Sequence, residues 1–312
     1  MDFKHVPVLY EECLESLAIK LDGVYVDGTL GGGGHAFGIG SKLSEKGMLI
    51  GIDRDEDALD AAARRLEPLG CDKVLVQSTY AEIRDVLEEL GVQGIDGALL
   101  DIGVSSFQLD NRERGFSYMH DAPLDMRMNK EDSFSAYDVV NKYDKTQLTK
   151  VIRKYGEEKW ASRISDFIIN RRKTEEVRTT GQLVDIIKAA IPASARREGP
   201  HPAKRTFQAI RIEVNGELEQ LQKAVDEFCD VLLPGGRLCI ITFHSLEDRI
   251  VKECFNRRLN PCTCPKEFPV CVCGKKPDVI KVTGKPIISG KDELEENPRA
   301  RSAKLRVIEK MR

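Results

Sequence analysis

Short apolar runs alternate with amphipathic stretches through the first hundred residues. Runs at 24–27, 48–53, 73–77 and 95–101 have the length and composition of buried strands. The stretches 56–69 and 83–90 between them carry apolar residues at helical spacing. Strands that alternate with helices in this way predict an α/β fold with a mostly parallel, doubly wound sheet.

The alternation stops after the fourth expected strand and resumes late in the chain. Residues 107–197 are polar, charged and helical in pattern, and 206–233 has the periodicity of one long helix that ends at Pro234-Gly235-Gly236. A fifth strand is expected at 237–243, and 279–282 and 305–308 are candidates to complete the sheet. The predicted domains are therefore 1–106, the first part of the core; 107–197, a helical insertion; and 198–312, the second part of the core with a basic C-terminal segment.

A glycine cluster follows the first expected strand, where a nucleotide-type α/β domain binds its cofactor. Asp27-Gly28-Thr29-Leu30 leads into Gly31-Gly32-Gly33-Gly34-His35, and glycines leave room for a ligand against backbone N–H groups. Asp53 ends the second strand, where an acid is placed to bond a ribose diol. The glycine spacing also satisfies the dinucleotide fingerprint of a dehydrogenase, so the motif alone does not choose between cofactors.

Acidic residues at the expected strand ends favour a cationic cofactor. Asp27, Asp53, Asp55 and Asp101 would repel a pyrophosphate and attract a sulfonium and an ammonium group. This favours S-adenosylmethionine over NAD. Tyr80, after the third strand, is placed either to meet the adenine or simply to cover the sheet.

The segment after the fourth strand, Asp101-Ile102-Gly103-Val104-Ser105-Ser106, is the candidate catalytic segment. Methyl transfer is an in-line displacement that depends mainly on positioning. Asp101 and Ser105 have the acceptors to bond the hydrogens of an amine substrate. The alternative is that Asp101 only binds the cofactor and the serines only cap the next helix.

Composition places few limits on partners. The chain has 312 residues, 41% apolar residues and a formal charge of −3, so contact with nucleic acid would depend on local basic clusters. The sequence has neither a signal-peptide pattern nor an apolar run long enough to cross a bilayer, so a cytoplasmic protein without membrane contact is expected. The candidate contacts to RNA phosphates are His201, Lys204, Arg205, His244, Arg299 and Arg301, although such clusters also occur as solvated faces.

Four of the nine cysteines form two close pairs, Cys262-Thr263-Cys264 and Cys271-Val272-Cys273. Four thiolates suggest a structural zinc, but one intervening residue is fewer than zinc sites usually have. Free thiols on a hairpin or a redox pair are the alternatives, and no metal is assigned from the sequence.

Six motifs in order make the chain similar to one family over most of its length. They are His5-Val6-Pro7-Val8-Leu9, Asp27 to His35, Asp101 to Ser106, Pro200 to Ala209, Phe243 to Asp248 and Asn297 to Ser302. On these motifs the chain resembles the bacterial 16S rRNA cytosine-N4 methyltransferases of the RsmH (MraW) type.

The resemblance implies methylation by S-adenosylmethionine of the N4 amine of a decoding-centre cytosine in 16S rRNA of the small ribosomal subunit. It implies a class I methyltransferase core with a Rossmann-like sheet and an inserted helical domain that helps to bind RNA. The cofactor contacts that it implies fall on Gly33, Gly34, His35, Asp53, Tyr80, Asp101 and Gln108.

Other functions stay open at this level. A DNA amino-methyltransferase would share the donor site, a dehydrogenase would share the glycine pattern, and a non-catalytic RNA-binding assembly factor would keep the cofactor site only for its structure. A homodimer is a further hypothesis on partners.

Overall fold

The computed structural model describes residues 7–105, 108–109, 111–197, 199–265 and 267–312. The chain divides into two compact units, residues 1–103 with 218–312 and residues 104–217. His5 and Val6 of the first motif, and Ser106 and Phe107 at the expected start of the insertion, lie outside the described residues.

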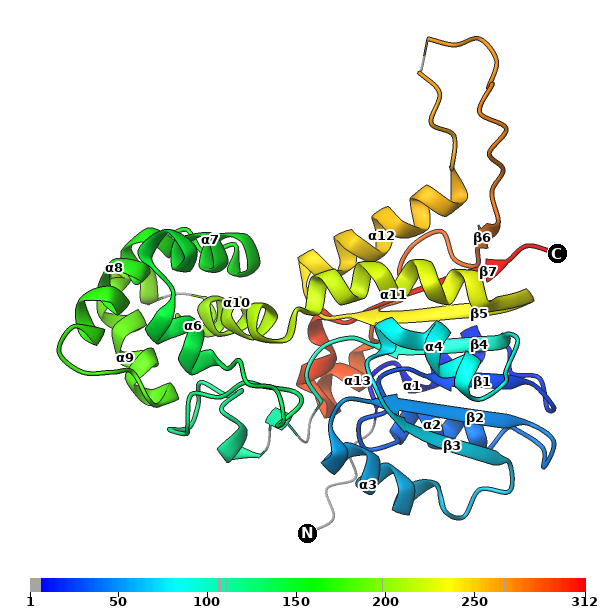
Figure 1. Ribbon diagram of the computed structural model, residues 1–312, viewed down its shortest axis with the longest axis horizontal. Coiled ribbons are helices and arrows are strands. Elements are labelled where there is room, and N and C mark those ends of the chain that lie inside the picture. Colours follow the sequence, from blue (N-terminus) through cyan, green and yellow to red (C-terminus); the bar gives the residue numbers. More distant parts are fainter. Residues whose placement is uncertain (1–6, 106–107, 110, 198, 266) are drawn as a thin grey trace. The chain divides into compact units, whose positions relative to one another are not determined.

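The first unit is built on a seven-stranded sheet with the order β3-β2-β1-β4-β5-β7-β6 (Figure 1). Its strands are β1 (Val24–Asp27), β2 (Met48–Asp53), β3 (Asp72–Gln77), β4 (Ile95–Asp101), β5 (Leu232–Thr242), β6 (Val279–Lys281) and β7 (Lys304–Lys310). The strands β1 to β5 are parallel, and β7 runs antiparallel between β5 and β6. The expected α/β class and its parallel strands are confirmed, and the two late apolar segments complete the sheet.

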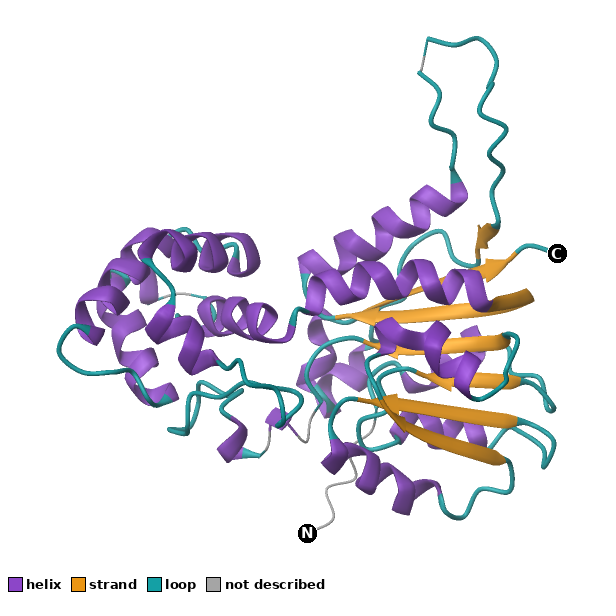
Figure 2. Ribbon diagram, viewed as in Figure 1, coloured by secondary structure: helices purple, strands orange, loops and turns teal. Residues whose placement is uncertain are grey.

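Helices cover both faces of this sheet (Figure 2). One apolar core holds residues of α4 (Ile83–Glu89), α11 (Glu217–Val231) and α12 (Ser245–Leu259). The other holds residues of α1 (Tyr10–Leu17), α2 (Gly34–Gly40) and α3 (Glu56–Leu66), and the short α13 (Lys291–Glu296) precedes β7. The inner strands β1, β2 and β4 are therefore largely buried on both faces, which explains their continuous apolar runs, whereas the edge strand β3 is only half-buried. Only their ends are left to meet a ligand.

The second unit is helical. It contains α6 (Ala136–Lys142), α7 (Lys145–Gly156), α8 (Ala161–Arg172), α9 (Thr180–Ala190) and α10 (Lys204–Asn215) around an apolar core of its own. Among the described residues of the unit, strand-type pairing is limited to an isolated bridge between Pro123 and Thr179. In the described part of the chain no helix has both the length and the apolar character needed to cross a membrane.

The single helix expected over 206–233 is wrong. The chain forms two helices there, α10 and α11, because Gly216 takes a left-handed conformation with φ 61° and its N–H closes the end of α10 on the Ile212 carbonyl. Phe207 and Ile210 of α10 pack in the helical core. The second unit therefore extends to residue 217, beyond the expected boundary at 197.

Candidate active site at the carboxyl ends of the strands

The glycine loop between β1 and α2 has the backbone shape that its sequence suggests. Gly31 and Gly33 have φ values of 49° and 72°, and Gly33 is the residue before the first turn of α2. A Cβ at Gly28 would collide with the Leu100 side chain, and one at Gly34 would collide with Pro7. Gly31 and Gly33 are needed for their positive φ, and Gly28 and Gly34 are needed because a side chain would not fit beside Leu100 and Pro7.

Asp53 holds this loop against the end of β2. Its Oδ2 accepts a hydrogen bond from the Gly31 N–H at 2.7 Å, and its Oδ1 accepts one from the Asp55 N–H at 3.0 Å. Burial raises the pKa of Asp53, although both hydrogen bonds oppose that rise. The structure thus brings together two of the predicted cofactor-binding elements, the glycine loop and the acid after the second strand.

Asp101, at the end of β4, is joined to the same loop. Its backbone N–H donates to Thr29 Oγ1 at 2.6 Å, and its Oδ2 lies 3.8 Å from His35 Nδ1. Its other oxygen, Oδ1, is buried and has no hydrogen-bond partner within the described part of the chain. Burial first, and then the charges of Asp27 and Glu247, raise the pKa of Asp101 to about 8.

Two further carboxyl groups lie close enough to affect Asp101. Asp27 is one of the acids expected at the strand ends, whereas Glu247 is not among the predicted site residues. Asp27 ends β1 and is buried, and its burial raises its pKa to about 7. Glu247 is fully buried in the first turn of α12, where its Oε2 accepts from the N–H groups of Phe243 at 2.8 Å and His244 at 3.1 Å. Asp27 had a signal, since it ends an apolar run like Asp53 and Asp101. The signal for Glu247 was the capping-box spacing His244-x-x-Glu247 directly after a strand.

His35 is buried in α2 and held on two sides. Its Nε2 lies 3.0 Å from the Val8 carbonyl oxygen, which only a protonated nitrogen can bond, and its ring stacks on Tyr10 with centroids 6.1 Å apart. This arrangement directs Nδ1 toward Asp101. Tyr80 is half-buried and packs against the core, with its Cβ 3.2 Å from the place that a Cβ on Gly28 would occupy. Tyr80 therefore lies beside the glycine loop, and its contact with the adenine stays a prediction.

Comparison with known proteins identifies the family. The chain matches the MraW methylase family over residues 2–311. The chain belongs to the MraW methylase family. It is 57% identical over 313 residues to "Ribosomal RNA small subunit methyltransferase H" of Ruminiclostridium cellulolyticum and 56% identical over 313 residues to the protein of that name from Acetivibrio thermocellus, with all of each chain covered. The family expected from the motifs is confirmed, and S-adenosylmethionine as the methyl donor follows from this membership.

The remaining predicted cofactor and catalytic residues of this MraW-family chain belong to the helical unit. The Gln108 N–H donates to Ser105 Oγ at 3.2 Å, and the Ser105 N–H donates to Gln108 Oε1 at 3.2 Å. This reciprocal pair has the pattern of a capping box. Ser105 therefore makes the contacts of a helix cap, Ser106 lies outside the described residues, and a catalytic role for the Ser105 hydroxyl stays a prediction.

The predicted RNA contacts have different surroundings in the MraW-family structure. His201 stacks on Tyr118 with centroids 4.7 Å apart, and burial lowers its pKa. His244 accepts the Glu247 N–H at 3.3 Å as the N-cap of α12. The charged members of the set are exposed, and Arg205 also donates to the Glu157 carbonyl at 3.1 Å. The exposed members are Lys204, Arg205, Arg299 and Arg301.

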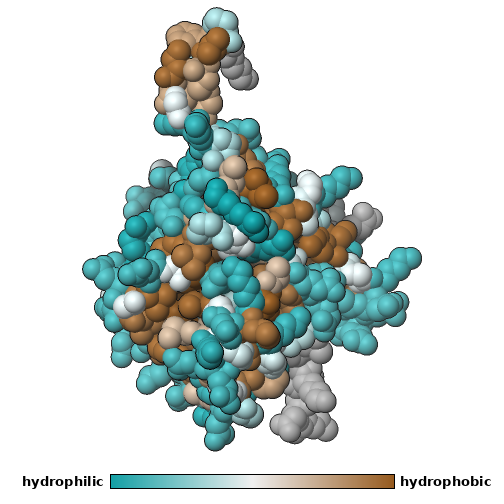
Figure 3. All heavy atoms as spheres, turned by 90° about the vertical axis from the view of Figure 1, so that its right-hand side faces the viewer, coloured by the Kyte–Doolittle hydropathy of each residue, from teal (hydrophilic) through white to brown (hydrophobic). Residues whose placement is uncertain are grey.

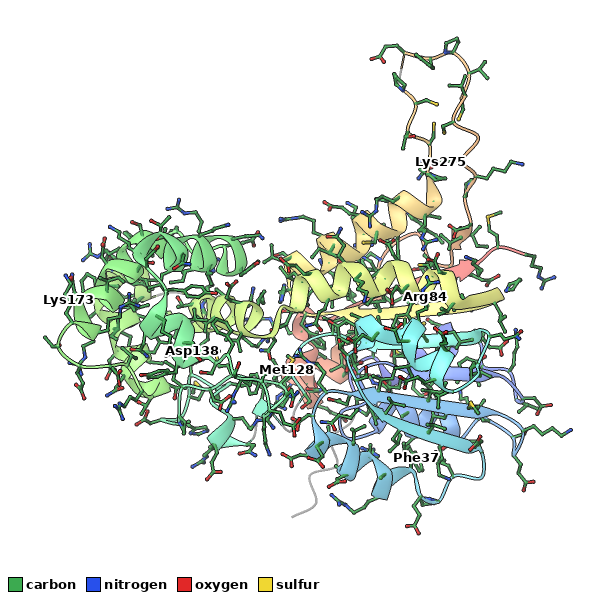
Figure 4. The ribbon with its side chains drawn as sticks, viewed as in Figure 1. Phe37, Arg84, Met128, Asp138, Lys173 and Lys275 are labelled. Carbon is green, nitrogen blue, oxygen red and sulfur yellow. The ribbon has the colours of Figure 1, made fainter. Side chains whose placement is uncertain are left out.

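A basic surface on α7 was missed from the sequence. Four cationic side chains line one hollow on this helix together with Thr146 and Thr149. They are Lys145, Lys150, Arg153 and Lys154. The signal was their helical spacing within 145–154, a segment that contains none of the six candidate RNA contacts. Figure 4 shows the polar side chains that extend from this unit of the MraW-family chain, with Asp138 and Lys173 labelled.

Proposed function

We propose that this chain transfers the methyl group of S-adenosylmethionine to the N4 amine of a decoding-centre cytosine in 16S rRNA. Family membership and full-length relatives named as small-subunit rRNA methyltransferases support the reaction class and the substrate. One structural observation supports the assignment of the site: the buried Oδ1 of Asp101 has no hydrogen-bond partner among the described residues. Asp101 is at the same time joined to the glycine loop by the hydrogen bond from its backbone N–H to Thr29. A buried acceptor without a donor is expected where a ligand supplies one.

The residues at the strand ends fit this cofactor. Bound S-adenosylmethionine supplies a methyl group on a positively charged sulfur. Asp27 and Asp101 would stabilise positive charge when ionised. Burial raises the pKa of both groups, so without a nearby cation their charged forms are disfavoured. We assign the adenosine and methionine parts to the residues predicted from the family, which are Gly33, Gly34, His35, Asp53, Tyr80, Asp101 and Gln108.

Asp101 is the residue that we propose to act on the acceptor. An exocyclic amine is a weak nucleophile because its lone pair is delocalised into the ring, and a hydrogen bond from the amine to Asp101 Oδ1 favours localisation of that pair. When the nitrogen gains the methyl group it must lose a proton, and Oδ1 can accept it. A pKa of about 8 suits a group that takes up and releases a proton near neutral pH. We propose Ser105 as a second acceptor for the amine.

Binding of the RNA is assigned to exposed cations on both units. Lysine and arginine side chains on a surface supply contacts to phosphates but do not read the base sequence. We assign this role to Lys204, Arg205, Arg299 and Arg301, and we add the α7 surface of Lys145, Lys150, Arg153 and Lys154. We propose that His201 and His244 support this surface indirectly. Each ring already has a protein contact, His201 with Tyr118 and His244 with the Glu247 N–H.

The decisive experiment is mass spectrometry of 16S rRNA from cells that lack the protein. Loss of N4-methylation at one decoding-centre cytosine, its return with the wild-type gene and its absence with Asp101→Ala are the expected results. Asp60→Ala, an exposed change on α3, is the control that should restore methylation. An unchanged set of cytosine methylations would support an assembly factor without catalysis, and purified protein that methylates naked DNA but neither 16S rRNA nor small subunits would support a DNA methyltransferase.

We also propose that the chain works in the cytoplasm, where its substrate is assembled, and that it forms a homodimer. Light scattering on the purified protein tests the dimer, and a mass of one chain over the working concentration range would exclude it.

A further inference from the structure

A long excursion of the chain separates α12 from β6. Residues 260–278 contain neither helix nor strand in their described part, and none of the described residues between 260 and 277 is buried. Figure 1 shows the segment projecting from its unit, and Figure 4 labels Lys275 on it. A loop of this length without secondary structure is unusual and needs a specific reason to keep its shape.

Apolar packing does not hold this loop. Its large apolar side chains are exposed, with Phe268 at 50%, Val270 at 70% and Val272 at 72%. Figure 3 shows apolar residues on the surface of the projecting segment, away from the rest of the protein. Some other interaction must therefore bring its two limbs together.

Four cysteines meet between the two limbs. Their sulfur atoms all lie within 4.8 Å of one another. Cys271 Sγ is 3.4 Å from Cys262 Sγ, 3.8 Å from Cys264 Sγ and 3.4 Å from Cys273 Sγ. The other five cysteines of the chain are buried, whereas Cys262 and Cys271 are exposed and Cys264 and Cys273 are half-buried, so the four form a distinct set.

The spacing of the sulfurs agrees with one tetrahedral metal. A zinc–sulfur bond of about 2.3 Å places the sulfurs of a tetrahedral site about 3.8 Å apart. A disulfide would need two sulfurs at about 2.05 Å and would divide the set into pairs. Here Cys271 approaches three partners at similar distances, which is the arrangement of a common centre.

The backbone supports the same interpretation. The Val272 N–H donates to Cys264 Sγ at 3.3 Å, and such a bond stabilises a sulfur that carries negative charge. It also joins the two Cys-x-Cys pairs directly, since Val272 lies between Cys271 and Cys273. The single intervening residue that weakened the zinc hypothesis at the sequence level is thus compatible with four sulfurs around one point.

We propose that Cys262, Cys264, Cys271 and Cys273 bind one zinc ion that closes the 260–278 loop. All four ligand positions are filled by protein thiolates, so the site is structural and offers no open position for a substrate. The thiols lose their protons to solvent when the metal binds. This site is independent of the methyl-transfer site and does not depend on its assignment.

Metal analysis of the full chain, purified without chelator, is the first test. About one zinc per chain is expected, together with four cysteines that resist alkylation until a chelator is added. Cobalt substitution should give the absorption of a tetrahedral tetrathiolate site. Zinc at background level, stoichiometric iron in its place, or a mass that shows two disulfides would each overturn the proposal.

Matched variants distinguish loss of the zinc ligands from a general loss of stability. Cys264→Ser and Cys271→Ser should lose most of the zinc and expose the Lys275-Lys276 bond to trypsin, whereas Thr263→Ala, between two ligands, and Cys71→Ala, in the core, should keep the full zinc content. Each variant should still bind S-adenosylmethionine, because the loop does not contribute to the glycine loop or its partners. Full zinc content in both serine variants would place the metal elsewhere.

Discussion

Thr29 in the glycine loop and Asp101 at the end of β4 are joined by a hydrogen bond of 2.6 Å, with the Asp101 backbone N–H as the donor. Asp53 makes the corresponding connection from β2, through the Gly31 N–H. Two strands on opposite sides of β1 therefore fix one loop between them.

The loop should tolerate a methyl group at Gly32 but not at Gly33. Gly33→Ala would need a left-handed residue with φ near 72° and would press its Cβ to 3.2 Å from Ala62 Cβ, and we expect a loss of about 1–2 kcal/mol in the free energy of unfolding. Gly32→Ala is the control, because nothing lies within 4 Å of its Cβ position. Urea unfolding of both variants measures the difference. Equal stabilities would show that the Gly33 conformation is not required.

Removal of the Asp53 carboxylate should weaken the cofactor site. Asp53→Ala deletes the acceptor of the Gly31 and Asp55 N–H groups and the proposed acceptor of the ribose, and we expect S-adenosylmethionine to bind about 1–3 kcal/mol more weakly. Calorimetry measures this loss, with Asp60→Ala as the control. Unaltered affinity would exclude Asp53 from the ribose.

Asp101 should make stability depend on pH. Its folded pKa of about 8 lies above the value of about 3.9 for an unfolded chain, so the folded protein holds an extra proton between these values. Stability from this group is present at low pH and is lost as pH rises toward 8. Asp101→Asn cannot ionise, so relative to wild type it should gain at least about 1 kcal/mol between pH 5 and pH 8.

Urea titrations at pH 5, 7 and 8 check the Asp101 prediction. Asp27, whose pKa is also raised, contributes to the slope in both proteins. Because Asp27 and Asp101 interact, Asp101→Asn removes the titration of Asp101 and also its effect on Asp27. Parallel pH profiles for the wild type and Asp101→Asn would contradict the raised pKa.

Glu247 should contribute more to the free energy of unfolding than an ordinary residue in the first turn of a helix. Glu247→Ala leaves the N–H groups of Phe243 and His244 without their buried acceptor, and we expect a loss of about 1–3 kcal/mol in unfolding free energy. Glu253→Ala, an exposed change on the same helix, is the control and should cost little. Thermal and urea unfolding distinguish the two, and similar small losses would show that the capping contacts are not needed.

The C-terminal arginines should affect RNA and not the cofactor. The double variant Arg299→Ala/Arg301→Ala should bind 16S rRNA more weakly, and the difference should shrink as salt is raised because fewer counterions are released. Its affinity for S-adenosylmethionine should stay that of the wild type. The exposed pair Lys42→Ala/Lys46→Ala is the control for loss of two positive charges, and an equal effect from that pair would remove the specific role of the arginines.

The predictable parts of this protein are those with a local signal. An apolar run that ends in an acid and is followed by glycines determines its own conformation, so β1, the glycine loop and α2 lie where the sequence indicates. Asp53 and Asp101 could be placed together because parallel strands end at one edge of a sheet. The placement of Asp53 and Asp101 depends only on the parallel direction of their strands and not on how individual side chains pack.

The parts that escaped prediction depend on tertiary context. The apolar periodicity runs across Gly216 without interruption. The helix divides there because Gly216 takes a left-handed conformation, while Phe207 and Ile210 pack in a separate core. The cysteine pairs have an unusual spacing in sequence and become a cluster only when the loop folds back on itself. Glu247 has the signature of an ordinary helix cap, and its proximity to Asp101 follows from the pairing of β4 with β5.

That pairing has a consequence for the order of folding. Asp101 lies opposite Ile241 in adjacent strands, yet all of residues 104–217 stand between them in the chain. Joining two distant segments is entropically costly until the intervening chain has become compact. The helical unit, whose contacts are local in sequence, should therefore fold first and bring β4 and β5 closer together for pairing. Substitutions in the core of the helical unit should then slow the formation of the strand-end site, although Asp53 and Asp101 themselves are unchanged.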